Sequence, residues 1–156
     1  MRKGGLMTEM QSDLVIVARG HPRPQPRPRF VKGRVISTMS KLAKGWRQEV
    51  SSAVKKDMRR TPGWRLGTDL ELFFVIPTKD KKRHGKPHVN RPDTDNLAKA
   101  VMDVLEERGA LPRGDADVAG LSVKKVWGSA EQAGVQIILR PAQQTEIPAA
   151  LLRQKN

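Results

Sequence analysis

Short runs of apolar residues predict four buried strands and a hairpin. Residues 14–18 form a continuous, largely β-branched run, which is typical of a buried strand. The clearest strand, residues 69–77, places alternate apolar side chains on one face, namely Leu70, Leu72, Phe74 and Ile76. Two further strands are predicted at residues 120–127 and 135–140, and a short hairpin at residues 30–36.

Apolar residues at helical spacing predict two helices. The first runs from about Ser40 to Met58 and has a mostly cationic polar side. The second runs from about Asn96 to Arg108 and ends at Gly109, a residue that readily adopts the left-handed conformation of a C-cap. Its apolar stripe consists of Leu97, Val101, Val104 and Leu105, and its opposite face carries Asp95, Lys99, Asp103 and Glu106.

This order of elements predicts an α+β fold. We expect one small domain, with a mixed β-sheet of about four strands and two helices packed on it, because 156 residues suit a single core. The domain should span residues 13–140. Residues 1–12 are predicted to be a disordered N-terminus, and residues 141–156 a loosely ordered C-terminal tail.

Composition excludes several chemistries. With no cysteine there is no disulfide framework, thiolate nucleophile or Cys-ligated zinc site. The chain also lacks a G-x-S-x-G elbow, a P-loop and a G-x-G-x-x-G motif. No apolar run is long enough to span a bilayer and no secretory leader opens the chain, so an intracellular, cytoplasmic location without membrane contact is expected.

Charge is unevenly distributed along the chain, whose net charge is +14. The first 60 residues carry 15 basic and 4 acidic side chains, whereas seven of the sixteen acidic residues lie between Asp93 and Asp117. Basic segments attract a polyanion such as nucleic acid. Carboxylates facing a phosphodiester suit a bridging divalent cation such as Mg²⁺, although an acidic helix face in a protein with basic loops is an alternative explanation.

Two basic segments are candidates for DNA contact. Residues 22–29 alternate Pro with Arg or Gln, which holds the arginines on a stiff extended loop leading into the hairpin. Residues 79–92 form a second basic loop, and either segment is alternatively an ordinary solvated linker. The candidate DNA-binding residues are Arg23, Arg27, Arg29, Lys32, Arg34, Lys81, Lys82, Arg83, Lys86 and Arg91.

The acidic motif begins directly before the second helix. If the preceding residues are extended, Asp93 and Asp95 point the same way, near a helix N-terminus that favours negative charge. Lys99 lies one turn beyond Asp95, and Asp115 and Asp117 follow the helix. The alternative is that Asp95 is an N-cap and Lys99 half of an i,i+4 ion pair.

The run from Arg91 to Lys99, followed by Asp103 and by Gly114-Asp115-Ala116-Asp117-Val118, resembles the signature of the RusA family of Holliday-junction resolvases. The Pro28-Arg29-Phe30 segment is also similar to many members, and the likeness extends from about Asp13 to Arg140. Two features depart from the family pattern, a longer basic loop over residues 79–91 and Pro112-Arg113-Gly114 before Asp115.

The resemblance implies a structure-selective endodeoxyribonuclease, a homodimer that cuts opposed strands of a four-way junction in a bacterial or phage-derived setting. One or two Mg²⁺ ions would be held by Asp93, Asp95 and Asp115, and Lys99 would be the essential lysine. The departure before Asp115 leaves Asp117 as an alternative third ligand.

Three other functions remain open at this point. One is a non-catalytic DNA- or RNA-binding module with the acidic cluster as a helix cap. Another is a different metal-dependent nuclease, such as an HNH-type site drawn from His84, His88 and Asn90, although we interpret these histidines as solvent-facing or phosphate-contacting loop residues. The third is a family member that binds junctions without cutting, against which the intact Asp93, Asp95 and Lys99 argue.

Overall fold

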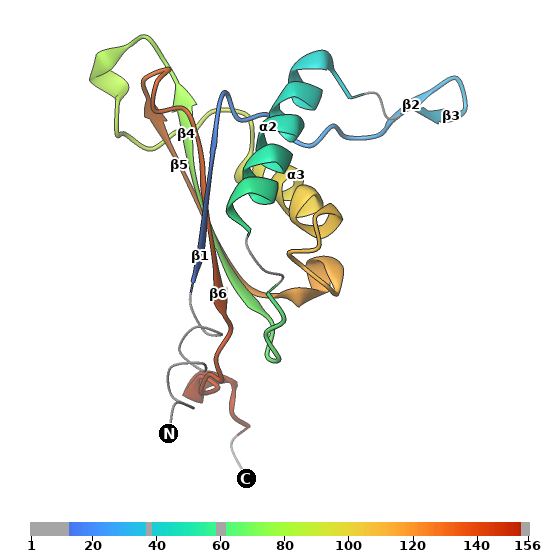
Figure 1. Cartoon of the computed structure of the whole chain (residues 1–156), viewed down its shortest axis with the longest axis vertical. Coiled ribbons are helices and arrows are strands. Elements are labelled where there is room, and N and C mark those ends of the chain that lie inside the picture. Colours follow the sequence, from blue (N-terminus) through green and yellow to red (C-terminus); the bar gives the residue numbers. More distant parts are fainter. Residues whose placement is uncertain (1–12, 37–38, 59–61, 154–156) are drawn as a thin grey trace.

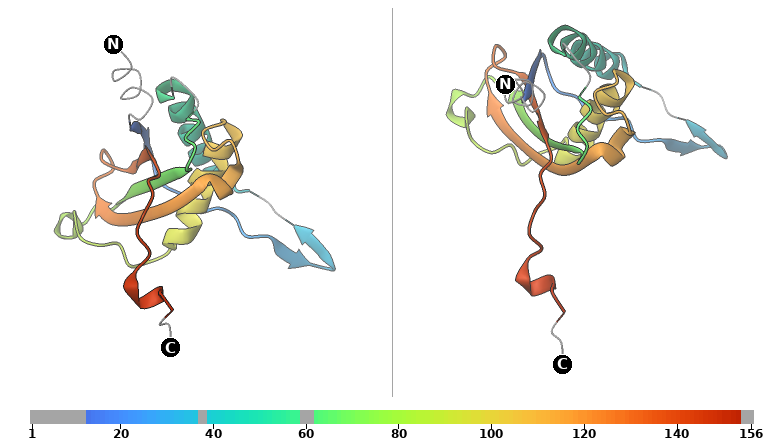
Figure 2. Two further views of the ribbon diagram at one scale, coloured as in Figure 1. Left: turned by 90° about the horizontal axis from the view of Figure 1, so that it is seen from below. Right: turned by 60° about the horizontal axis from the view of Figure 1, so that its bottom comes forward.

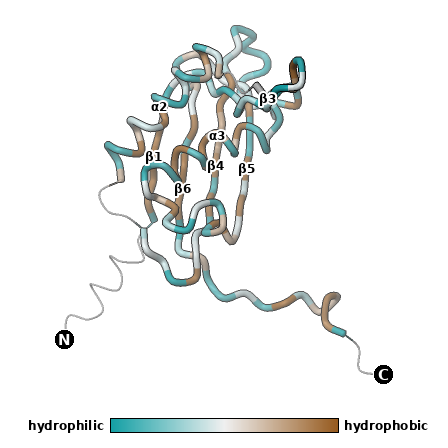
Figure 3. The backbone as a smooth tube through the Cα atoms, turned by 90° about the vertical axis from the view of Figure 1, so that its right-hand side faces the viewer, coloured by the Kyte–Doolittle hydropathy of each residue, from teal (hydrophilic) through white to brown (hydrophobic). Residues whose placement is uncertain are grey.

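A computed structural model describes residues 13–36, 39–58 and 62–153. Its centre is a mixed four-stranded sheet in the order β1 (Leu14–Arg19), β6 (Gly134–Pro141), β4 (Thr68–Pro77), β5 (Val118–Gly128), as Figure 3 shows. β6 is antiparallel to both of its neighbours, whereas β4 and β5 are parallel. The predicted mixed sheet is confirmed.

Both α-helices of the described chain, α2 (Lys41–Asp57) and α3 (Thr94–Glu107), lie on the same side of this sheet (Figure 1). The alternation predicted for β4 explains the arrangement, because its alternate apolar side chains all point under the helices and are buried. The apolar stripe of α3 packs over these β4 side chains, and its residues Leu97, Val101, Val104 and Leu105 are fully buried. The predicted α+β fold is therefore confirmed.

The predicted hairpin forms a separate two-stranded sheet of β2 (Arg29–Val31) and β3 (Arg34–Ile36). Lys32 and Gly33 make its turn, both with positive φ (50° and 76°), as a two-residue hairpin turn requires. Figures 1 and 2 show the hairpin projecting away from the body of the protein.

The crossover from β4 to β5 contains the basic loop, α3 and two short 3-10 helices, η1 (Lys81–Arg83) and η2 (Gly114–Asp117). The loop is not simply solvated. Its residues 85–88 hydrogen-bond to the backbone of β5, through Gly85 N to Trp127 O (2.8 Å) and His88 N to Lys125 O (3.0 Å). The segment that leads into α3 is thereby fixed against the sheet.

Beyond β6 the chain leaves the sheet and includes a short 3-10 helix, η3 (Ala149–Leu151), as Figure 2 shows. The predicted disordered N-terminus, residues 1–12, lies outside the described residues. Within the described ranges, every helix is too short or too polar to cross a membrane.

Candidate functional site

The acidic motif lies at the start of α3, which begins at Thr94, two residues before the predicted position. Asp93 is the N-cap, with extended backbone (φ −70°, ψ 150°), and Asp95 lies in the first helical turn. The condition for Asp93 and Asp95 to point the same way, an extended segment that holds both, is therefore not met, because Asp95 is helical. The alternative of Asp95 as the cap is wrong, because the cap is Asp93. The Asp93 side chain makes no capping hydrogen bond, which leaves its carboxylate available for another role.

Lys99 connects α3 to η2. Its Nζ donates to Asp115 Oδ2 at 2.5 Å and lies 3.2 Å from Asp103 Oδ1, one turn farther along α3. The hydrogen bond to Asp115, followed by the one to Asp103, raises the pKa of Lys99 above its ordinary value. Lys99 is thus held in its charged form between two carboxylates, and its i,i+4 partner is Asp103, not Asp95.

Three carboxylates lie together beside Lys99. One oxygen from each of Asp103, Glu106 and Asp115 falls within 4.8 Å of the others, and Asp93 and Asp95 are not members of this group. The structure therefore brings together Lys99 and Asp115 of the four predicted catalytic residues. The helical projection placed Asp103 and Glu106 on the face of Lys99 but gave no reason to join them to Asp115, because that contact depends on where η2 folds back.

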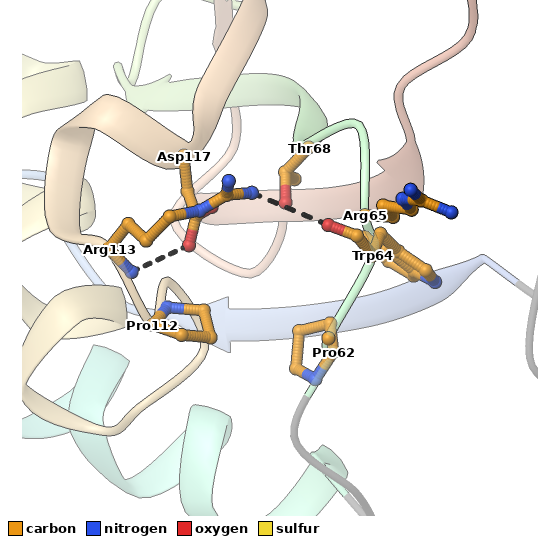
Figure 4. A pocket seen from close by; sticks show the side chains of 8 residues that line it. Pro62, Trp64, Arg65, Thr68, Pro112, Arg113 and Asp117 are labelled. Atoms are coloured by element: carbon orange, nitrogen blue, oxygen red, sulfur yellow. Dashed lines mark hydrogen bonds and ion pairs between the residues drawn. The ribbon is translucent and has the colours of Figure 1, made fainter.

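The two aspartates of η2 differ in their surroundings. Asp117 is 4% exposed, and both of its oxygens accept from Arg113, one from the backbone N (2.8 Å) and one from Nε (2.5 Å). Arg113 also donates from Nη2 to the carbonyl of Trp64, at the wall of a cavity of about 400 Å³ (Figure 4). Asp117 is therefore occupied in fixing η2. Asp115, in contrast, has a buried Oδ1 without a hydrogen-bond partner among the described residues.

The proline- and arginine-rich segment lies against the first turn of α3. Gln25 N donates to Asn96 O (3.1 Å), and Arg27 Nη2 lies 3.9 Å from Asp93 Oδ2. With its amide oxygen turned toward Arg27, Asn96 also accepts from Arg27 Nη2 at 2.8 Å. A cleft of about 530 Å³ lies between this segment and the start of α3, and its walls include Arg27, Arg29, Arg91 and Asp93. Cations from both predicted basic segments thus surround the first acid of the motif.

Lys125, which sequence analysis missed, holds the other side of this region. From β5, its Nζ donates to the carbonyls of Asn90 (2.6 Å) and Pro92 (2.7 Å), directly before Asp93. A lysine within a strand carries no local signal for such a role, because the contact depends on the loop pairing with the end of β5.

The remaining predicted DNA-binding residues lie at the surface. Arg23 is half-buried, and the exposed ones are Arg29, Lys32, Arg34, Lys81, Lys82, Arg83, Lys86 and Arg91. The interpretation of the loop histidines as solvent-facing is wrong for His88, which is 3% exposed and packs against Trp127, with ring centroids 4.2 Å apart. Arg83 lies over the same Trp127 ring, and His84 Nε2 lies 3.0 Å from Thr78 O. These histidines are part of the packing of the loop.

The site is a cluster of carboxylates in contact with a lysine, and basic segments lie beside it on a small α+β fold. This arrangement suits a protein that acts on phosphodiesters. The comparison with known families is specific, since the endodeoxyribonuclease RusA family model matches residues 19–140. The chain belongs to the RusA family of endodeoxyribonucleases, whose activity is that of a Holliday-junction resolvase. The comparison with curated proteins gave no match.

Proposed function

We propose that this protein is a Mg²⁺-dependent endonuclease that resolves four-way DNA junctions by cutting two opposed strands. The observation that carries the proposal is the position of Asp115. Its Oδ2 bonds Lys99, while its buried Oδ1 has no partner in the described part of the chain. A buried carboxylate oxygen without a donor is costly unless a ligand completes it.

The residues fit a hard divalent cation, because carboxylate oxygens are the ligands that Mg²⁺ prefers. We assign Asp93, Asp95 and Asp115 as the residues that would hold one or two ions. Asp115 is preferred to Asp117, whose oxygens are engaged by Arg113. When bound, such a cation supplies charge stabilisation at the scissile phosphate and activates water for attack.

Lys99 has a role that does not depend on which carboxylates hold the ion. It is held charged next to Asp115, so it places a compact cation where negative charge develops on the phosphate in the transition state. Asp93 and Asp95 lie at a helix N-terminus, where the helix dipole favours negative charge. Arg27 and Arg29 line the adjoining cleft and would orient the DNA backbone there.

The alternative of a non-catalytic nucleic-acid-binding module is less consistent with the geometry. That function requires the acidic cluster to serve as a helix cap, yet the Asp93 side chain makes no cap hydrogen bond. Asp115 lies outside the helix altogether and contacts Lys99. The arrangement therefore favours catalysis over a purely structural use of these acids.

We further propose a homodimer, since two identical sites related by a two-fold axis match a substrate with two opposed scissile strands. The sheet face opposite the helices is its candidate surface, because Val15, Val17 and Phe73 are exposed there. For a nuclease that acts on branched DNA, we propose an intracellular, bacterial or phage-derived setting.

Incubation with a labelled synthetic four-way junction, with and without Mg²⁺, tests the proposal. We expect paired nicks at symmetric positions on two opposed arms, only when the cation is present, and little cutting of a linear duplex of the same sequence. Binding without cutting at any Mg²⁺ concentration would favour the non-catalytic alternative. Sedimentation of the protein, alone and with the junction, tests the dimer.

A further inference from the structure

The β2–β3 hairpin exposes an aromatic side chain that the core does not use. Phe30 is 77% exposed, and Val35, its partner in the register, is 66% exposed. Phe74, in contrast, is fully buried in the core. An exposed phenylalanine forgoes the stabilisation that burial provides, so a projecting hairpin that displays one points to a partner.

The two faces of the hairpin differ in chemistry. Residues that pair directly across two antiparallel strands share a face, so Phe30 and Val35 form an apolar face. Arg29 and Arg34 belong to the other face, which is mixed because they pair in the register with Ile36 and Val31, and Lys32 occupies the turn. These three cations are exposed, and the hairpin contains no acidic residue. An anionic partner that also offers flat apolar surfaces satisfies both faces at once, and nucleic acid has both properties.

The hairpin continues directly from the candidate site. Arg29, its first residue, lines the same cleft as Asp93, and Arg27, two residues earlier, lies 3.9 Å from that carboxylate. The hydrogen bond from Gln25 to Asn96 anchors this segment to α3. From Arg29 the strand reaches roughly 10 Å farther to the turn, at about 3.3 Å per residue. The hairpin projects from the body of the protein (Figures 1 and 2), so DNA bound at the cleft would meet it.

We propose that the hairpin places Phe30 against bases exposed at the branch point of the DNA, while Arg29 and Arg34 contact the neighbouring phosphates. This inference rests on the proposed function. Base pairs at a branch point lie at the ends of stacked arms, so stacking an aromatic ring there disrupts less base stacking than in a continuous duplex. Phe30 thus supplies preference for branched over linear DNA. A second copy of this chain fits the hairpin less well, because its net charge of +14 opposes the three cations.

Equilibrium binding in the absence of divalent cations tests the role of Phe30 without cleavage. The full chain and the variants Phe30→Ala, Phe30→Leu and Phe30→Trp are titrated with a four-way junction and with a linear duplex of the same sequence. Loss of one stacked base predicts about 5- to 150-fold weaker junction binding for Phe30→Ala. Phe30→Leu should lose most of the same affinity, whereas Phe30→Trp should retain it. Linear-duplex binding should be unchanged in all three variants.

Circular dichroism and sedimentation of each variant guard against loss of folding. Equal junction affinity for the unsubstituted protein and for Phe30→Ala would overturn the inference. The proposed function would stand, because junction cleavage with Mg²⁺ is measured separately. Dissociation of a dimer on Phe30→Ala, with equal weakening on both DNAs, would instead assign the hairpin to a second copy. If the chain with Phe30 binds both DNAs equally, the inference and the junction preference both fail.

Discussion

Lys125 Nζ donates to the carbonyl of Pro92 at 2.7 Å, one residue before the first acid of the motif. The same ammonium donates to Asn90 O at 2.6 Å. A charged donor that satisfies two carbonyls fixes the segment more firmly than a neutral one. The position of Asp93 thus depends on a residue of β5 that contacts the segment only through the tertiary fold.

Replacing Lys125 by Met should slow cleavage by misplacing Asp93. The methionine keeps most of the apolar stem and removes both hydrogen bonds, each worth about 1.5–3 kcal/mol when the donor is charged. Single-turnover cleavage of a junction at saturating protein separates this effect from binding. Lys124→Met is the matched control, because Lys124 lies on the opposite face of β5 and is exposed. Equal rates for the two variants would contradict the positioning role.

Asp95→Asn should abolish junction cleavage, with a loss of at least about 10²–10³ in rate, and leave metal-independent junction binding intact. This variant also distinguishes two possible sets of metal ligands that share Asp115. One set adds Asp93 and Asp95, and the other adds Asp103 and Glu106. If Asp103 and Glu106 hold the ion instead, Asp103→Asn will shift the Mg²⁺ dependence of cleavage and Asp95→Asn will not. Mg²⁺ titrations of cleavage by both variants decide between the sets. Full activity of Asp95→Asn would show that Asp95 is not a metal ligand.

Asp117→Ala should destabilise the fold by about 1–3 kcal/mol, because it leaves the backbone N–H of Arg113 without its acceptor. The measurement is equilibrium urea unfolding, in which the midpoint should fall. Asp115→Ala is the control within the same 3-10 helix and should abolish cleavage with a smaller effect on stability. Cleavage is also measured at urea concentrations well below the midpoint, where Asp117→Ala is folded. A loss of cleavage under those conditions would make Asp117, and not Asp115, the third ligand.

His88 should make stability depend on pH near neutrality. Burial, followed by the charge of Lys125, lowers the pKa of His88 below its ordinary value of 6.5. The unfolded chain then binds this proton more readily than the folded chain, so stability is full above about pH 6.5 and falls as pH drops through the lowered pKa. His88→Phe keeps an aromatic ring beside Trp127 and should flatten this dependence between pH 7 and 5. His21, whose pKa is also lowered, is retained in both proteins.

DNA affinity should fall steeply with salt, with a slope near 0.9 per phosphate bound. Replacing Lys81 and Lys82 by Ala should reduce this slope by roughly 1 for each phosphate that the variant no longer neutralises. A charge-matched control replaces Lys55 and Lys56, in the last turn of α2, by Ala. Slopes measured between about 50 and 200 mM salt should distinguish the two double variants, and identical slopes would exclude the loop from the interface.

Periodic apolar residues were sufficient to predict most of the fold, because burial of one face imposes the alternation seen in β4 and the stripe seen in α3. The start of α3 was missed, since Thr94 and Asp95 are polar first-turn residues without apolar periodicity. The burial of His88 and the contact of Lys125 with Pro92 were also missed. Both arise from the way residues 85–88 lie along β5, and no local pattern encodes that approach.

The same approach has a consequence for assembly. Residues 85–88 occupy backbone groups at the end of β5, through Gly85 N to Trp127 O, Trp127 N to Lys86 O and His88 N to Lys125 O, so an extended peptide from another molecule could not use these groups. At the far margin of the sheet, β1 has β6 as its one neighbouring strand among the described residues. Strand addition at that margin would lie away from the acids of α3 and would leave them accessible to a large substrate.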